Sequence, residues 1–224
     1  MGEVPLAFFM QIRGITMFEL SSFLFFLSAS MLLIIAPGPD LLFAITQGIS
    51  NGRRAGVATG MGLALGNSIH TLAAAFGISL IFKTSAIAFT VLKILGAAYL
   101  LFLAFKAIKN RNSMFTLKDE KPASERALLA RGFLMNVLNP KVALFFLAFL
   151  PQFVNPAIGN VPLQMIILGL IFMVLTAIIF GTIGYFSGFF GQWLVQKPAA
   201  SRYISYGSAS VFVALAVKLA LTER

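Results

Sequence analysis

Two charged residues inside long apolar stretches of the sequence directly follow prolines. Asp40 follows Pro37-Gly38-Pro39, and Lys141 follows Asn139-Pro140. A charge at the centre of a bilayer costs about 2.5–3.5 kcal/mol on insertion scales, so such residues face a protein interior or a water-filled cavity. We expect Asp40 to respond to a proton or a ligand, with Lys141 as its first candidate partner and Lys93 as the second. The alternative is structural: the charges form a plain ion pair, or Asp40 caps a restarted helix.

The prolines beside these charges act through the backbone. Proline has no N–H and clashes with the preceding helical turn, so Pro37, Pro39 and Pro140 each predict an interrupted helix. The carbonyls that lose their helical partners need another donor. An interruption also exposes a helix N-terminus, which favours an anionic group such as a carboxylate, while free carbonyls suit an ammonium group. One break can therefore bind a zwitterion; the alternative is an ordinary proline kink.

Other polar residues in the apolar stretches are candidates to line the same cavity. They are Asn67, His70, Lys93, Tyr99 and Asn136. Asn67 and His70 are three residues apart and share a helix face. His70 has a reference pKa near 6.5, which suits a proton relay. A hydrogen bond between two helices explains this single histidine equally well.

The composition argues against an ordinary soluble enzyme. Of 224 residues, 59% are hydrophobic, 24 are Phe and 11% are charged, whereas soluble domains are about 45–50% apolar and about 25% charged. The sequence contains no Cys, which excludes disulfides, Cys-ligated zinc and thiol chemistry. A single His excludes a multi-His metal site. We therefore predict no catalytic centre, no metal and no cofactor.

The apolar stretches are long enough to cross a bilayer as helices, since each crossing needs about 20 apolar residues. We predict an all-α membrane protein with six transmembrane helices, because irregular backbone cannot face lipid. The predicted spans are 18–47, 55–82, 85–105, 132–153, 163–190 and 203–221. The first and fourth contain the proline breaks. Residues 1–17 fit no span, and we interpret them as an N-terminal tail, with Met17 as an alternative start.

The basic residues predict an orientation. Eleven of the seventeen Lys and Arg residues fall after spans one, three and five, seven of them in the loop 106–131. The positive-inside rule places these loops in the cytoplasm and both termini outside. The net charge of +10 is therefore interpreted as a membrane anchor, with no nucleic-acid partner.

The chain also shows signs of an internal repeat. Pro39-Asp40 and Pro140-Lys141 occupy similar places 101 residues apart, and Gly96-Ala97-Ala98 has a loose counterpart in Gly207-Ser208-Ala209. Two halves of three spans, 18–105 and 132–224, must be inverted relative to each other. Inverted repeats with interrupted helices are typical of secondary transporters.

Several motifs occur in order along the chain and cover nearly everything from Met17 onward. They are Ala36-Pro37-Gly38-Pro39-Asp40, Asn51-Gly52-Arg53-Arg54-Ala55-Gly56, Gly66-Asn67, Lys93-Ile94-Leu95-Gly96-Ala97-Ala98-Tyr99-Leu100, Arg131-Gly132-Phe133, Asn136 with Asn139-Pro140-Lys141, Phe145-Phe146 and Leu150-Pro151-Gln152-Phe153. Together they resemble the LysE/RhtB family of amino acid exporters. That family commonly has Asn or another small polar residue after Pro-Gly-Pro, so Asp40 is a variant.

The resemblance implies an inverted three-plus-three helical fold, often dimeric, in a bacterial-type inner membrane. It implies export of a small amino acid or derivative, such as homoserine, threonine, homoserine lactone or leucine, driven by proton antiport. It also implies a central site at the two breaks, which carries over to Asp40, Asn139, Pro140 and Lys141. The alternatives are an exporter of another small solute or cation and a structural membrane protein without transport.

Overall fold

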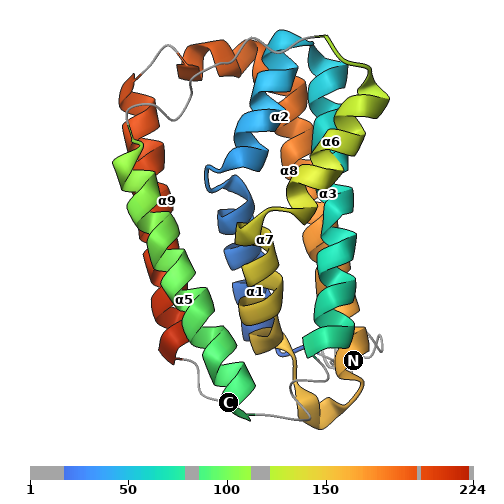
Figure 1. Cartoon of the computed structure of the whole chain (residues 1–224), viewed down its shortest axis with the longest axis vertical. Coiled ribbons are helices and arrows are strands. Elements are labelled where there is room, and N and C mark those ends of the chain that lie inside the picture. Colours follow the sequence, from blue (N-terminus) through green and yellow to red (C-terminus); the bar gives the residue numbers. More distant parts are fainter. Residues whose placement is uncertain (1–17, 79–85, 112–121, 196–197, 222–224) are drawn as a thin grey trace, which may run out of the picture.

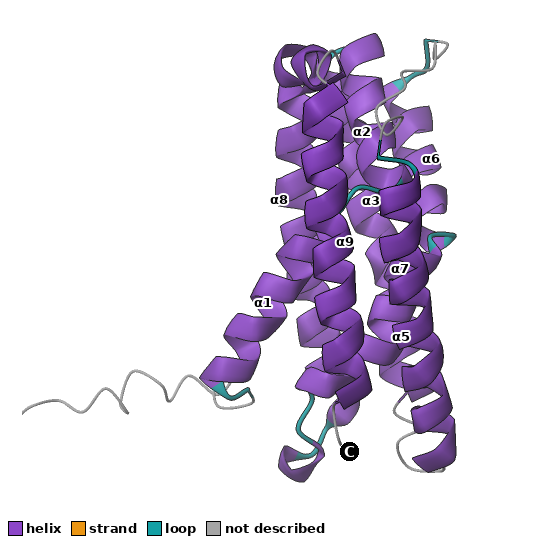
Figure 2. Cartoon of the chain, turned by 90° about the vertical axis from the view of Figure 1, so that its left-hand side faces the viewer, coloured by secondary structure: helices purple, strands orange, loops and turns teal. Residues whose placement is uncertain are grey.

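The computed structural model describes residues 18–78, 86–111, 122–195 and 198–221. All regular structure in these ranges is helical (Figures 1 and 2). The predicted tail 1–17 lies outside the described residues.

The helices follow each other in this order along the chain. They are α1 (Leu20–Ile35), α2 (Pro39–Ser50), α3 (Arg53–Ala73) continued by a π-helical turn η2 (Ala74–Ile78), α5 (Ala86–Lys109), α6 (Glu125–Val137), α7 (Pro140–Leu144), η3 (Phe145–Phe149), η4 (Leu150–Phe153), η5 (Pro156–Ile158), α8 (Val161–Val195) and α9 (Pro198–Leu221). Figure 1 shows α1–α2, α3, α5, α6–α7, α8 and α9 running between the two ends of the molecule.

Both predicted interruptions are present. α1 and α2 meet at an angle of 57° across Pro37, and α6 meets the helical segment that begins at Pro140 at 48°. Each restarted helix has a proline in its first turn. That position suits proline because its missing N–H has no helical acceptor there.

The apolar helices identify a membrane protein. Among the described residues, α5, α8 and α9 are long and apolar enough to cross a membrane, and the two bent pairs raise the number of candidate spans from three to as many as five. α3 is not among them, because its Gly, Thr, Asn, Ser and His residues lower its hydropathy. The all-helical membrane class is confirmed, whereas six spans in an inverted repeat stay a prediction.

The outer faces of the helices are also apolar. Leu101, Phe102 and Phe105 on α5 are about half exposed or more, as are Val174 and Ile178 on α8. A large exposed apolar surface of this kind fits contact with lipid. Helical structure extends several residues into each end of the predicted loop 106–131, since α5 ends at Lys109 and α6 begins at Glu125.

The helices form two groups. α3 packs between α8 and α6, and α2 packs against α3 and α8. α5 packs mainly along α9, and Figure 1 shows this pair beside the first group. Close approach of α3 to α8 depends on small residues: an added Cβ at Gly184 would collide with the backbone of Gly56. Glycines allow such close helix crossings in membranes.

We predict that Gly184→Ala lowers the stability of the detergent-purified protein by about 1–3 kcal/mol, because the new methyl group must push two backbones apart. Thermal unfolding followed by size-exclusion chromatography measures this loss. Gly181→Ala on the same helix is the matched control, because nothing lies within 4 Å of a Cβ there. Equal stability of the two variants would contradict the close crossing.

Candidate functional site

The first break leaves main-chain carbonyls without helical donors. In a continuous helix, the carbonyl of Leu33 would accept from the N–H of residue 37, but Pro37 has none. The backbone is extended at Gly38, and α2 restarts at Pro39. The C-terminus of α1 therefore presents free carbonyls inside the protein.

Lys141 satisfies these carbonyls from the second break. Its Nζ donates to Leu33 O at 3.1 Å and to Ala36 O at 3.0 Å. The side chain is 5% exposed. The ammonium thus lies at the negative end of the α1 dipole, where a cation is favoured.

The second break is arranged by the same chemistry. Pro140 deprives the carbonyl of Asn136 of its helical donor. That carbonyl instead accepts from the backbone N–H of Asn139 at 2.9 Å, and His70 Nε2 on α3 lies 3.0 Å from it. The Asn139 side chain accepts from the N–H of Lys141 at 2.9 Å and caps α7.

Asp40 lies between the two breaks. It belongs to the first turn of α2, where a negative charge is favoured by the helix dipole. Its Oδ2 accepts from Asn136 Nδ2 at 3.3 Å, and the side chain is 1% exposed. Lys141 attracts Asp40 electrostatically, but the hydrogen bonds of the ammonium go to the α1 carbonyls.

Several polar atoms around Asp40 are buried with no hydrogen-bond partner among the described residues: Asp40 Oδ1, Asn136 Oδ1, Asn139 Nδ2 and Asn67 Oδ1. A small cavity of about 10 Å³ adjoins Asp40, Asn136, Lys141 and Thr176, which is about the volume needed for one water molecule. Buried polar groups without a partner are uncommon in proteins and call for an explanation, such as a bound water molecule or a functional role.

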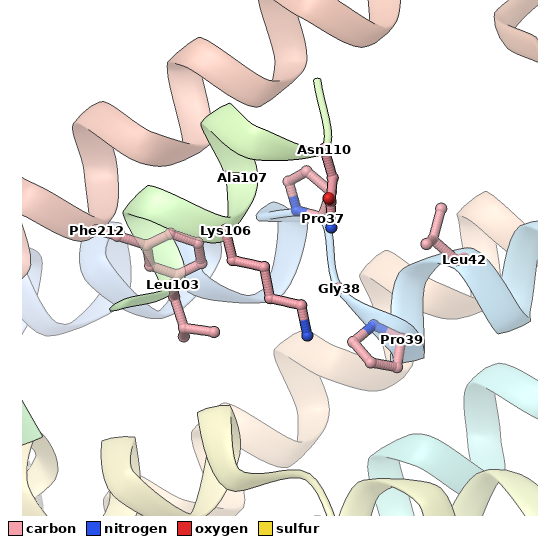
Figure 3. Close-up of a pocket in the computed structure, with 9 residues that line it drawn as sticks. All are labelled: Pro37, Gly38, Pro39, Leu42, Leu103, Lys106, Ala107, Asn110 and Phe212. Atoms are coloured by element: carbon pink, nitrogen blue, oxygen red, sulfur yellow. The ribbon is translucent and has the colours of Figure 1, made fainter. Parts of the chain in front are cut away.

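A larger pocket lies on the other side of the first break. Its volume is about 380 Å³, near the lower end of the range for small-molecule sites. Figure 3 shows its lining, which comes from the break, the C-terminal half of α5 and α9: Pro37, Gly38, Pro39, Leu42, Leu103, Lys106, Ala107, Asn110 and Phe212. Gly38 lies between this pocket and the polar cluster around Lys141, because a Cβ on Gly38 would lie 3.4 Å from Lys141 Nζ.

The structure brings most of the predicted site residues together. Pro37, Gly38 and Pro39 form the first break. The other predicted residues that come together form or surround the second break: Asp40, Asn136, Asn139, Pro140, Lys141 and His70. Asn67 donates to Thr176 at 3.1 Å beside them. Lys93 and Tyr99 lie apart on α5; they line neither the pocket nor the small cavity, and the Tyr99 ring contacts Phe102.

Sequence reasoning missed the α5 side of the pocket. The sequence predicts Lys106 in the basic loop 106–131 and singles out neither Asn110 nor Thr176, which lies on α8 beside the small cavity. The spacing of the two α5 residues with Leu103 and Ala107 is that of one helix face. This periodicity is the sequence signal that indicates a helix continuing past residue 105.

The model of the LysE type translocator family matches residues 31–223, which include both breaks. The chain belongs to this family. Its members are translocators rather than enzymes, so the buried charges belong to a membrane transporter.

Individual relatives support this assignment. The uncharacterised membrane protein YrhP of Bacillus subtilis is 32% identical over 183 residues, which cover 77% of this chain and 86% of the relative. An uncharacterised membrane protein of Vibrio cholerae is 31% identical, covering 72% and 78%. The leucine efflux protein of Klebsiella pneumoniae is 26% identical, covering 92% and 98%. No solved structure matches the chain.

We predict that Lys141→Met destabilises this translocator by about 2–5 kcal/mol, because it leaves two buried carbonyls and a carboxylate without their cation. Methionine keeps the approximate length of the side chain, so the loss of stability reports on the missing ammonium group. Thermal unfolding in detergent measures the change, and Lys109→Met on the exposed end of α5 is the control. An equal melting temperature for the two variants would show that the Lys141 contacts contribute nothing.

Proposed function

We propose that this translocator exports a small amino acid or derivative, of the homoserine, threonine, homoserine lactone or leucine type, by proton antiport across a bacterial-type inner membrane. Its family and its similarity to a leucine efflux protein support the substrate class. We propose further that it functions as a homodimer.

The observation that carries this proposal is the pocket on the first break. The pocket combines a cationic side chain, Lys106, with an apolar wall of Leu42, Leu103 and Phe212. A small amino acid has a charged end and a compact side chain, which match these two parts. The volume of about 380 Å³ is sufficient for a small amino acid.

Proton coupling is assigned to Asp40. Protonation of Asp40 from the outside removes its attraction for Lys141 and changes its hydrogen bond with Asn136. Because Lys141 also binds the C-terminus of α1, this change alters the restraints on the break that borders the pocket. Release of the proton to the inside then restores the charged pair and completes the cycle.

The pairing of the helices supports a three-plus-three inverted repeat. An axis that exchanges α1–α2 with α6–α7 would also exchange α3 with α8 and α5 with α9. α3 packs on α8 and α5 packs on α9, as an axis that exchanges the members of each pair requires. We therefore propose six crossings, with α3 as the second.

This topology predicts which loops are accessible from outside. The chain has no native Cys, so a single introduced thiol reports on one position. Arg126→Cys in the basic loop is expected to react with a membrane-impermeant maleimide only after the membrane is opened. Ala157→Cys, in the exposed turn η5 between spans four and five, is expected to react in intact spheroplasts. Labelling of both from the same side would contradict six crossings.

The transport cycle predicts the effect of Asp40→Asn. In proteoliposomes loaded with labelled amino acid, an inward proton gradient is expected to accelerate efflux through the wild type. The Asn variant cannot exchange a proton at this position, so the gradient is expected to have no effect on its efflux. Glu125→Gln, which changes an exposed carboxylate at the start of α6, is the control and should behave as wild type.

Three outcomes distinguish the alternatives. Gradient-driven efflux through the Asn variant would overturn the role of Asp40. Transport of a cation or another small solute in place of amino acids would favour the alternative that the protein exports such a compound. Correctly inserted protein that moves none of the compounds would favour a structural role.

A further inference from the structure

The pocket on the first break carries a positive charge that no charged group of the described chain neutralises. Among the described residues that line it, Lys106 is the one ionisable residue, beside Asn110 and apolar side chains. The Lys106 side chain forms no ion pair or hydrogen bond within the described residues, whereas its backbone carbonyl accepts from the N–H of Asn110. A pocket of this composition favours a ligand with an anionic group.

The position of Lys106 follows from the face that α5 turns towards the break. Leu103, Lys106, Ala107 and Asn110 follow the i, i+3, i+4, i+7 spacing of one helix face. Figure 3 shows the Lys106 side chain extending toward Gly38 and Pro39. Its ammonium therefore lies over the interrupted backbone rather than along the outside of α5.

The backbone opposite Lys106 is also electropositive. α2 begins at this point, and Gly38 at its N-cap has no side chain that could occupy the helix end. The first N–H groups of a helix have no helical acceptors and carry partial positive charge. The Asp40 carboxylate of that turn is directed away from the pocket, toward Asn136.

The rest of the lining determines which anion fits. Leu42, Leu103 and Phe212 form an apolar surface beside the ammonium. A hydrated inorganic anion would leave this surface without a partner. A carboxylate attached to a small, largely apolar body fills both parts.

We infer that Lys106 binds the α-carboxylate of the transported compound and makes this pocket selective for free amino acids over their lactones, amides and esters. This inference rests on the proposed function and narrows its substrate class. Within the proposed substrates, it favours leucine, threonine and homoserine and disfavours homoserine lactone, in which the carboxylate is closed into an ester.

The test compares each amino acid with a carboxyl-blocked analogue in proteoliposomes. Leucine is paired with leucinamide and homoserine with homoserine lactone. The wild type is expected to transport the free acid of each pair with the lower KM. Lys106→Gln is expected to raise the KM for the free acid about ten-fold or more, since hydrogen bonds to charged groups are among the stronger ones. The KM for the blocked analogue should stay unchanged.

Two further variants separate charge from structure. Lys106→Arg keeps the charge and should retain most of the preference for the free acid. Lys109→Gln removes an exposed charge one turn further along α5, outside the pocket, and should leave both KM values unchanged. Lys106→Met repeats the neutral substitution and should match Lys106→Gln, with size-exclusion profiles confirming that both variants are folded.

Failure of the inference and failure of the proposed function give different results. If the wild type transports amino acids but Lys106→Gln and Lys106→Met leave the preference for the free acid unchanged, the assignment of Lys106 is wrong and amino acid export stands. An equal rise in KM for free and blocked compounds also overturns it. If the wild type transports neither member of any pair, the proposed function fails, and the inference fails with it.

Discussion

The bond between the Lys141 ammonium and the two carbonyls at the end of α1 is the interaction on which the interior of this protein depends. Proline at position 37 removes the donor that Leu33 O would otherwise have. In a membrane interior, an unsatisfied carbonyl costs several kcal/mol. Lys141 offsets that cost with hydrogen bonds of 3.1 and 3.0 Å. A single side chain thereby connects residues more than one hundred positions apart in the sequence and holds the two breaks next to each other.

The second break depends on the first in the same way. The carbonyl that Pro140 leaves free is approached by His70, and the side chain of Asn136 donates to Asp40 at the start of α2. Each interruption is thus completed by side chains from another part of the chain. A change of charge at Asp40 acts on both breaks, because its partners Asn136 and Lys141 each belong to the hydrogen bonding of a helix end. In the proposed transport cycle, this link couples a proton on Asp40 to the pocket, whose lining residue Gly38 lies beside Lys141 Nζ.

The two helix groups give the pocket its shape. α2, α3, α6 and α8 approach closely through glycines, so their relative positions leave little freedom. α5 and α9 form the second group, and the pocket takes its lining from the first break on one side and from this pair on the other (Figures 1 and 3). Lys106 on α5 therefore sets the charge of the pocket, while the break supplies its backbone. The proposed selectivity residue and the proposed coupling residue thus lie on different helices.

The sequence by itself determined the helical membrane class, the position of both breaks and the charges beside them. These features are local: apolar runs define helices, and a proline removes its own N–H wherever it occurs. The tertiary structure decided which groups meet. It directed Lys141 to carbonyls rather than into a hydrogen bond with Asp40, brought His70 to the Asn136 carbonyl, placed Lys106 in a pocket instead of a loop, and left Lys93 and Tyr99 away from the polar cluster. Those outcomes depend on the bend angles and the depth at which helices cross, and neither quantity is set by the neighbours of a residue in the chain.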